Sequence, residues 1–207
     1  MYDAIIDLDG LTVDLGGNPV LRGMELHVSP GEIVAIVGPN GSGKSTLLRC
    51  VAGLQPATDG QVLVFGEPPA DDAGFWGRVG LLFEEPAWYP ALTTREHLEL
   101  VAAVHAEARM TVDAALEEFA LAERADAVPL NLSTGQRQRL SLAATLLRPS
   151  TLLLLDEPER GLDAAFRARL GDLLEEYAHE GGTVLMATHD PGLAERARRV
   201  PPTGVAA

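Results

Sequence analysis

The sequence predicts an α/β fold organised around a parallel sheet, and three observations lead to this prediction. An apolar run at 33–37 leads directly into a glycine-rich loop at 38–45. A second apolar run at 151–155 is typical of a central parallel strand that is buried on both faces. Between these runs, over 88–148, the pattern changes from short strands to amphipathic helices. We therefore expect a strand-rich core that is interrupted by an inserted helical segment.

Length, charge and cysteine content narrow the class of protein. The chain has 207 residues, enough for one domain with an inserted subdomain. Its formal net charge is −14, whereas nucleic-acid binders present a basic face, so neither DNA nor RNA is expected as a partner. No apolar run approaches the roughly 18 residues of a spanning helix, and the N-terminus lacks a signal-peptide pattern, so we expect a cytoplasmic protein. The single cysteine, Cys50, cannot form an internal disulfide and is expected in the core.

Short strands are predicted on both sides of the glycine-rich loop. We expect them at 4–6, 11–13, 24–28, 33–37, 61–65 and 79–83, with turns at 16–19, 29–32 and 58–60. The helix that follows the loop should run from Gly43 to about Ala52, because Gly53 is a typical helix terminator.

Three helices are predicted within the inserted segment. The first begins at Thr93, which has the spacing of a capping box with Glu96. A second is expected over 111–121. The third should cover 132–147, because Pro149 cannot continue it.

The C-terminal part returns to the core. After the apolar strand at 151–155, a long amphipathic helix is expected over 163–178 and a strand over 183–187. Asp190 and Pro191 combine an N-cap with proline at the first helical position, so another helix should begin there. The tail from residue 200 has too few apolar residues for another domain.

The glycine-rich loop carries the P-loop pattern G-x-x-x-x-G-K-[ST], formed by Gly38, Pro39, Asn40, Gly41, Ser42, Gly43, Lys44 and Ser45. Glycines let main-chain N–H groups turn toward an anion, and the following helix adds about half a positive charge at its N-terminus. Lys44 is the only lysine beside 15 arginines, which suits a position that needs a compact ammonium group. We predict that the loop, together with Thr46, binds nucleotide phosphates and that the Ser45 hydroxyl is a ligand of Mg²⁺.

Two carboxylates follow the apolar run at 151–155. Open α/β sheets bind ligands at the carboxyl ends of their strands, where Asp156 can hold Mg²⁺ directly or through water. Glu157 is the next residue and should project differently, so it can accept a proton from an attacking water. The alternative for Glu157 is a solvated loop carboxylate without a catalytic role.

A P-loop alone is compatible with kinases, GTPases and ATPases, and motifs later in the chain distinguish between these classes. Leu132-Ser133-Thr134-Gly135-Gln136 resembles the ABC signature, and 152–158 resembles a Walker B segment. Gly161-Leu162-Asp163 resembles a D-loop, and His189 resembles the switch histidine. The whole chain thus resembles the ATP-binding subunit of an ABC transporter, with the motifs in the family's order.

This resemblance implies a fold, partners and a location. The fold is a P-loop NTPase (RecA-like) core with an N-terminal antiparallel β subdomain, and the single domain divides into a core at 1–87 and 149–207 and a helical signature subdomain at 88–148. Two chains, identical or different ATPases, would close head-to-tail around two MgATP and drive separately encoded membrane subunits. The protein would be a peripheral cytoplasmic subunit on the inner face of the cell membrane.

The resemblance also implies roles for individual residues. The catalytic set would be Lys44, Glu157 and His189, with His189 at the γ-phosphate. The signature residues that face the partner's nucleotide would be Ser133, Gly135 and Gln136, at a helix N-terminus suited to an anion. The Mg²⁺ ligands would be Ser45, Asp156 and Glu84. Asp163 would contact the partner near the same interface.

Two positions depart from the family's pattern. Glu84 stands where the family usually has the Q-loop glutamine. Unit charges 4 Å apart interact by about 4 kcal/mol at an effective dielectric of 20, so attraction to the metal and repulsion from the phosphates are comparable. We expect an altered metal affinity with retained hydrolysis. Leu15 stands where an aromatic ring often stacks on adenine, which leaves selectivity for ATP over GTP open.

Trp88 and Tyr89 lie where the family joins its helical subdomain and receives a helix from the membrane subunit. We predict that a membrane-spanning permease docks near Glu84 to Pro90. The alternative is that the two aromatic side chains simply pack beneath a loop.

Two other functions stay open from the sequence. One is a soluble ABC ATPase with a non-transport role, although the lack of a coiled-coil insertion or a second ATPase module argues against the chromosome-organising and translation-factor branches. The other is a nucleotide-gated binding module with little hydrolysis, which the presence of Glu157 and His189 disfavours.

Overall fold

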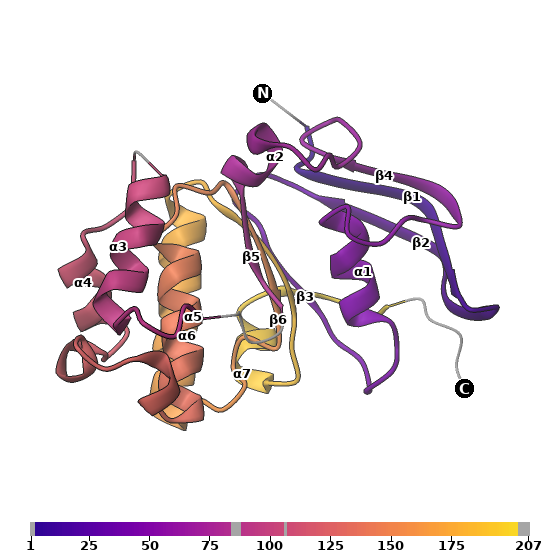
Figure 1. The fold of residues 1–207 in the computed structure, drawn as a ribbon. Coiled ribbons are helices and arrows are strands. Elements are labelled where there is room, and N and C mark those ends of the chain that lie inside the picture. The colour runs from indigo at the N-terminus through magenta and orange to yellow at the C-terminus, as the bar shows by residue number, and fades with distance from the viewer. Residues whose placement is uncertain (1–2, 84–87, 106, 203–207) are drawn as a thin grey trace.

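The computed structural model describes residues 3–83, 88–105 and 107–202 and contains two sheets with helices around them (Figure 1). The strands are β1 (Ile6–Leu15), β2 (Asn18–Val28), β3 (Ile33–Ile36), β4 (Asp59–Val64), β5 (Val79–Leu82), β6 (Leu152–Asp156), β7 (Thr183–Ala187) and β8 (Arg198–Val200). The helices are α1 (Lys44–Val51), α2 (Ala73–Arg78), α3 (Thr94–Val104), α4 (Val112–Glu118), α5 (Thr134–Leu146), α6 (Ala164–His179) and α7 (Pro191–Glu195), with short 3-10 turns at Ala122–Arg124 and Pro129–Asn131. No helix of the described residues is long and apolar enough to cross a membrane.

The first sheet is antiparallel and has the order β2-β1-β4. Gly16 and Gly17 form the β1–β2 turn with φ values of 57° and 82°, which glycine adopts without a steric penalty. The separate strands predicted at 4–6 and 11–13 are wrong, because β1 is one strand. Its register shifts between Leu8 and Leu11, where Gly10 has a φ of 63°. A glycine bulge bends the strand there without ending it.

The second sheet is parallel and has the order β5-β6-β7-β3-β8. The prediction of a buried central strand after residue 150 is confirmed, since β6 lies between β5 and β7. Its side chains alternate between two core clusters. Leu153 and Leu155 pack in the cluster that includes α5 and α6, whereas Leu152 and Leu154 pack in the cluster that includes α1 and the antiparallel sheet. Both faces of the parallel sheet are therefore covered, as such sheets require.

Two elements were not predicted. The edge strand β8 pairs with β3 through the segment Arg198–Val200, which carries two arginines and only one apolar residue. Helix α2 has six residues, and the Asp72 carboxylate caps it by accepting a bond from the Phe75 N–H at 2.8 Å. Both elements are too short to produce a periodic apolar pattern.

The predicted helix starts are confirmed by their caps. Thr93 and Glu96 form the capping box of α3. Asp190 caps α7, with Pro191 at the first helical position. Helix α4 ends earlier than predicted, at Glu118, because Ala120 takes a left-handed conformation with a φ of 50° and the chain turns there.

Helix α1 lies between the two sheets (Figure 1). Its buried side chains pack in the same cluster as β1 and β2, and Cys50, which is 2% exposed, is one of them. The predicted core position of Cys50 is therefore confirmed. Because α1 is wedged between the sheets, the loop that precedes it is held at the carboxyl edge of β3.

Candidate functional site

The candidate site lies at the carboxyl edge of three adjacent parallel strands. The P-loop follows β3, Asp156 and Glu157 lie at the end of β6, and His189 follows β7. Because β7 pairs with both β3 and β6, these segments come together although they are far apart in the sequence. This edge is where parallel α/β sheets bind their ligands.

The P-loop wraps around the side chain of its lysine. Lys44 is 5% exposed, and its Nζ atom donates to the carbonyl oxygens of Gly38 and Pro39, both at 2.9 Å. Gly43 has a φ of 94°, and a Cβ atom there would lie 2.7 Å from the Leu21 side chain on β2. A glycine is thus required at position 43 by the backbone conformation and by the packing against β2.

One polar atom of the loop indicates the kind of ligand that suits it. The Ser42 hydroxyl is buried and has no hydrogen-bond partner among the described residues. A buried hydroxyl without a partner is costly, and a phosphate oxygen would satisfy it. Together with the ammonium of Lys44 and the start of α1, this hydroxyl makes the loop fit a phosphate group.

Asp156 occupies the last position of β6 and contacts the helix that follows the P-loop. Partial burial raises the pKa of Asp156 above its ordinary value, while a hydrogen bond from the Ser45 hydroxyl and the charge of Lys44 oppose that rise. Ser45 and Asp156 therefore place two oxygen atoms together, which are the ligands that Mg²⁺ prefers. No group of three or more histidine, cysteine, aspartate or glutamate side chains suited to a metal occurs in the described part of the chain.

Glu157 directly follows β6 and has an unusual backbone conformation. Its φ of 47° is left-handed, which is uncommon for a residue other than glycine. The Glu157 N–H donates to the carbonyl of Ala187 at 2.8 Å, so the turn is tied to β7. The Oε1 atom of Glu157 lies 3.3 Å from the Nε2 atom of His189. Two of the three predicted catalytic side chains thus lie close together.

The signature segment opens α5, and its side chains are engaged with one another. The Ser133 hydroxyl accepts a bond from the Gln136 N–H at 3.2 Å, and the Ser133 N–H donates to the Gln136 side chain at 2.9 Å. A Cβ atom on Gly135 would lie 2.7 Å from the carbonyl oxygen of Gly161, so only glycine fits there. The signature segment is therefore packed directly on the D-loop segment of the same chain.

A cavity of about 400 Å³ joins the P-loop side to α5. Its lining residues are Ser45, Phe83, Thr134, Arg137, Gln138, Asp156, Glu157 and Arg160. Its described lining does not include the three predicted signature contacts Ser133, Gly135 and Gln136. The structure brings Ser45 of the P-loop and the two carboxylates to one cavity. Of the signature segment, Thr134 reaches this cavity within one chain, but the three predicted contacts do not.

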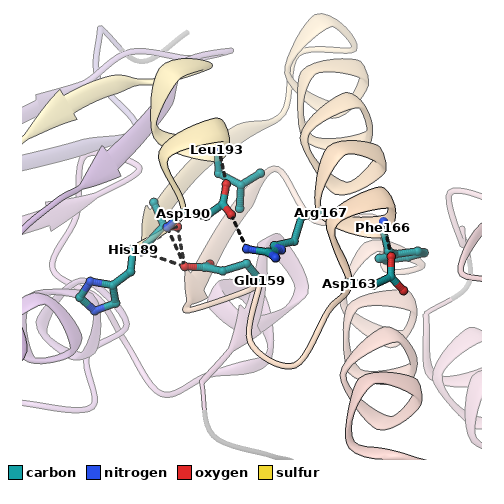
Figure 2. Close-up of polar contacts among 8 residues, drawn as sticks. Glu159, Asp163, Phe166, Arg167, His189, Asp190 and Leu193 are labelled. Atoms are coloured by element: carbon teal, nitrogen blue, oxygen red, sulfur yellow. Dashed lines mark hydrogen bonds and ion pairs between the residues drawn. The ribbon is translucent and has the colours of Figure 1, made fainter.

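The sequence interpretation missed Glu159, which holds the segment after β7. Its Oε1 atom accepts bonds from the Thr188 hydroxyl at 2.7 Å, the His189 N–H at 2.8 Å and the Asp190 N–H at 3.1 Å (Figure 2). Asp190 in turn pairs with Arg167 at 3.0 Å. Nothing in the local sequence separates this glutamate from a solvated loop carboxylate, since its partners lie about 30 residues away.

The structure describes two of the three other positions that the sequence analysis discussed. Glu84 lies outside the described residues. Leu15 is 40% exposed at the β1–β2 turn. Asp163 caps α6 by accepting the Phe166 N–H at 2.8 Å, and it also pairs with Arg139 on α5.

A second groove, of about 260 Å³, lies where the helical segment meets β5. Its lining includes Trp88, Tyr89, His97 and Leu100. The Trp88 ring meets the His97 ring edge-on at 5.3 Å, and the Tyr89 N–H donates to His97 at 3.0 Å. Tyr89 is nevertheless 61% exposed, so part of this aromatic surface faces outward.

Known proteins share both the sequence pattern and the fold. A family model described as "ABC transporter" matches residues 21–160. The chain is 34% identical over 201 residues to the glutamine transport ATP-binding protein GlnQ of Escherichia coli (strain K12), covering 93% of this chain and 84% of that protein. It is 44% identical over 176 residues to the aliphatic sulfonates import ATP-binding protein SsuB 3 of Pseudomonas savastanoi pv. phaseolicola (strain 1448A / Race 6), covering 84% of this chain and 63% of that protein.

Solved structures give the same result. An ATP-binding subunit of an ABC transporter superposes with a TM-score of 0.83 at 28% identity, covering 96% of this chain and 85% of the other. A dimeric ATP-binding cassette in a post-hydrolysis state, bound to ADP and Pi, superposes with a TM-score of 0.82 at 28% identity, covering 95% and 94%. The predicted α/β fold with a P-loop NTPase core is thereby confirmed. The chain belongs to the ABC transporter family as an ATP-binding subunit, and it is an ATPase of that family.

Proposed function

We propose that two copies of this chain, or this chain and a related ATPase, close head-to-tail around two MgATP and drive separately encoded membrane subunits. One observation carries the proposal: Ser45, Asp156 and Glu157 share one cavity. Of the signature segment of the same chain, Thr134 lines this cavity, whereas Ser133, Gly135 and Gln136 do not. A second chain would therefore have to supply these three predicted signature contacts to the site. The dimeric cassette that superposes on this chain supports the same arrangement.

In this proposal the P-loop binds the triphosphate of ATP. Lys44 Nζ, which is bonded to two loop carbonyls, turns its charge toward the β- and γ-phosphates. The Ser42 hydroxyl donates to a phosphate oxygen and so gains the partner that it lacks within the described residues. The main-chain N–H groups of 40–46, which include the start of α1, supply further donors.

Ser45 and Asp156 hold Mg²⁺ in this proposal, with Glu84 as a third oxygen ligand. Asp156 suits the role because the Ser45 hydroxyl already contacts its carboxylate. When bound, Mg²⁺ neutralises charge on the phosphate oxygens. Few protein ligands are needed, since Mg²⁺ keeps several waters and bonds to substrate phosphates.

Glu157 and His189 act on the reacting groups. Glu157 accepts the proton of the water that attacks the γ-phosphorus, while the bond from that phosphorus to the β-phosphate oxygen breaks. His189 supports the γ-phosphate from the end of β7. The 3.3 Å separation of Glu157 Oε1 and His189 Nε2 supports a shared position for both side chains beside that phosphate.

The helical segment 88–148 would act as the signature subdomain and 1–87 with 149–207 as the core. Ser133, Gly135 and Gln136 at the start of α5 would meet the nucleotide held by the other chain. Ser133 still has its hydroxyl hydrogen to donate, because its oxygen only accepts from the Gln136 N–H. The groove beside Trp88 and Tyr89 would receive a helix of the membrane-spanning permease on the inner face of the membrane.

A phosphate-release assay on the purified chain tests the proposal. We expect release that requires Mg²⁺, stops with EDTA, and has a specific activity that rises with protein concentration because the active form is a dimer. Glu175→Ala is the control, since Glu175 pairs with Arg196. A specific activity independent of concentration would contradict the shared site. The absence of any release would instead indicate a nucleotide-gated binding module.

A further inference from the structure

Glu159 joins the segments that follow two neighbouring strands. It lies two residues beyond Glu157, in the tight turn that follows β6, where the Arg160 N–H donates to the Glu157 carbonyl at 3.0 Å. Its carboxylate reaches across to the segment after β7. A single atom, Oε1, accepts from one hydroxyl and two main-chain N–H groups there, at 2.7, 2.8 and 3.1 Å.

These bonds hold the main chain of His189, and Glu159 does not hold its imidazole ring. Figure 2 shows the imidazole directed away from the Glu159 carboxylate, which contacts the His189 main chain. The imidazole instead lies 3.3 Å from Glu157. Any effect of Glu159 on the imidazole is therefore transmitted through the backbone of 188–190.

The contact is specific and internal. Hydrogen bonds to an ionised carboxylate are about twice as strong as bonds between neutral groups. The other oxygen of Glu159, Oε2, is buried with no hydrogen-bond partner among the described residues, so this side chain is not a solvated surface carboxylate. The segment is also held from its far side, where Asp190 pairs with Arg167 and caps α7 through the Leu193 N–H at 3.0 Å.

We propose that Glu159 is a positioning residue for hydrolysis, which fixes the main chain at His189 so that the imidazole faces Glu157. The inference rests on the proposed role of His189 at the γ-phosphate. In this role the Glu159 carboxylate ties the turn after β6 to the segment after β7, so that the two keep a constant relative position. Movement of the turn carrying Glu157 and Glu159 would move His189 with it.

The first test uses the nucleotide-free protein. Amide hydrogen exchange of His189 should become at least about tenfold faster in Glu159→Ala, because its N–H loses its acceptor. Exchange of Asp190 should change less, because its N–H also donates to the Thr188 hydroxyl oxygen at 3.0 Å. Exchange at Leu185 in the middle of β7 should not change. Unchanged exchange at His189 would overturn the inference.

The second test is a double-mutant cycle on turnover. We expect Glu159→Ala to lower kcat about 10- to 100-fold, the range found when residues that orient metal ligands are removed, with little change in the Kd for ATP. In a His189→Ala background the same change should have little further effect, because Glu159 acts through His189. Glu159→Gln keeps an acceptor oxygen and should recover most of the activity. If the alanine variant does not fold, both tests are done with Glu159→Gln, which should also speed amide exchange and lower kcat, but by smaller factors.

Glu32→Ala is the matched control, since the Glu32 carboxylate also accepts a main-chain bond, from the Ser29 N–H at 3.0 Å, but does so outside the site. Its turnover should stay within about twofold of wild type. If the fold losses in kcat of Glu159→Ala and His189→Ala multiply in the double variant, the two residues act independently. That result would overturn the inference and leave the proposed function intact. If His189→Ala alone keeps wild-type turnover, the proposed role of His189 fails, and the positioning role fails with it.

Discussion

The Nε2 atom of His189 lies 3.3 Å from the Oε1 atom of Glu157, although 32 positions separate the two residues in the chain. The pairing of β6 with β7 brings them together, since Asp156 is in register with Ala187 at the ends of these strands. Both residues then leave the sheet at the same edge. This contact is the basis for expecting that hydrolysis depends on both side chains.

Replacing Glu157 by glutamine removes the proton acceptor and keeps the shape of the side chain. We expect kcat to fall about 10²- to 10⁴-fold, the usual cost of losing a general base, while ATP still binds. Single-turnover phosphate release and equilibrium binding of ATP measure the two effects. Undiminished turnover would assign the proton transfer to another group.

Replacing Lys44 by alanine removes two hydrogen bonds to loop carbonyls and the only ammonium side chain of the site. Charged hydrogen bonds contribute about 1.5 to 3 kcal/mol, so the Kd for ATP should rise roughly 10- to 100-fold. Lys44→Arg is the matched variant, and it should also weaken binding because a guanidinium fork does not fit the cradle. Wild-type affinity in both variants would show that the nucleotide is held elsewhere.

The parts of the fold that were predicted from the sequence are those encoded locally. The P-loop has an apolar strand before it and an amphipathic helix after it, and β6 begins with four consecutive leucines. What could not be predicted depends on distant partners. The strand β8 exists because Arg198–Val200 pairs with β3, and β1 continues through Gly10 because β2 and β4 pair with it on both sides.

The candidate site divides in the same way. Lys44, Ser45, Asp156 and Glu157 lie in motifs that carry their own chemical meaning, and the structure brings them to one edge. Glu159 has no such motif, because its importance arises only where the turn after β6 meets the segment after β7. The packing of Gly135 on Gly161 is likewise a contact between segments that the sequence does not pair.

Cys50 gives a prediction on pH. Burial raises the pKa of its thiol to about 11, from an ordinary value of 9.0. At pH 8 about one molecule in a thousand would carry the thiolate, so iodoacetamide should label the folded protein slowly and the denatured protein fast. Equal labelling rates would contradict the buried position.

The same shift of the Cys50 pKa links stability to pH. The folded state keeps the thiol proton where the unfolded state loses it, so the stabilising contribution is complete below pH 9 and is lost as the pH rises toward about 11. The free energy of unfolding in urea should therefore fall over this range. Cys50→Ala should lose less stability between pH 9 and pH 11 than the wild type.

The aromatic groove gives a prediction on the membrane partner. Trp88→Ala and Tyr89→Ala should each reduce co-purification with the membrane-spanning permease, because both side chains line the groove. Trp76→Phe is the control, since Trp76 lies on α2 and bonds to Asp71. Quantitative pull-down from membranes measures the effect, and retention of the partner by both groove variants would refute the docking site.

The most direct test of the shared site is the mass of the Glu157→Gln protein in solution, measured by sedimentation with and without ATP and Mg²⁺. Slow hydrolysis should trap the closed state, so we expect a monomer without nucleotide and a dimer at saturating ATP. At the same ATP concentration the Lys44→Ala protein should form less dimer, because its Kd for ATP is raised. A Glu157→Gln protein that binds ATP to saturation and stays monomeric would contradict a site completed by a second chain.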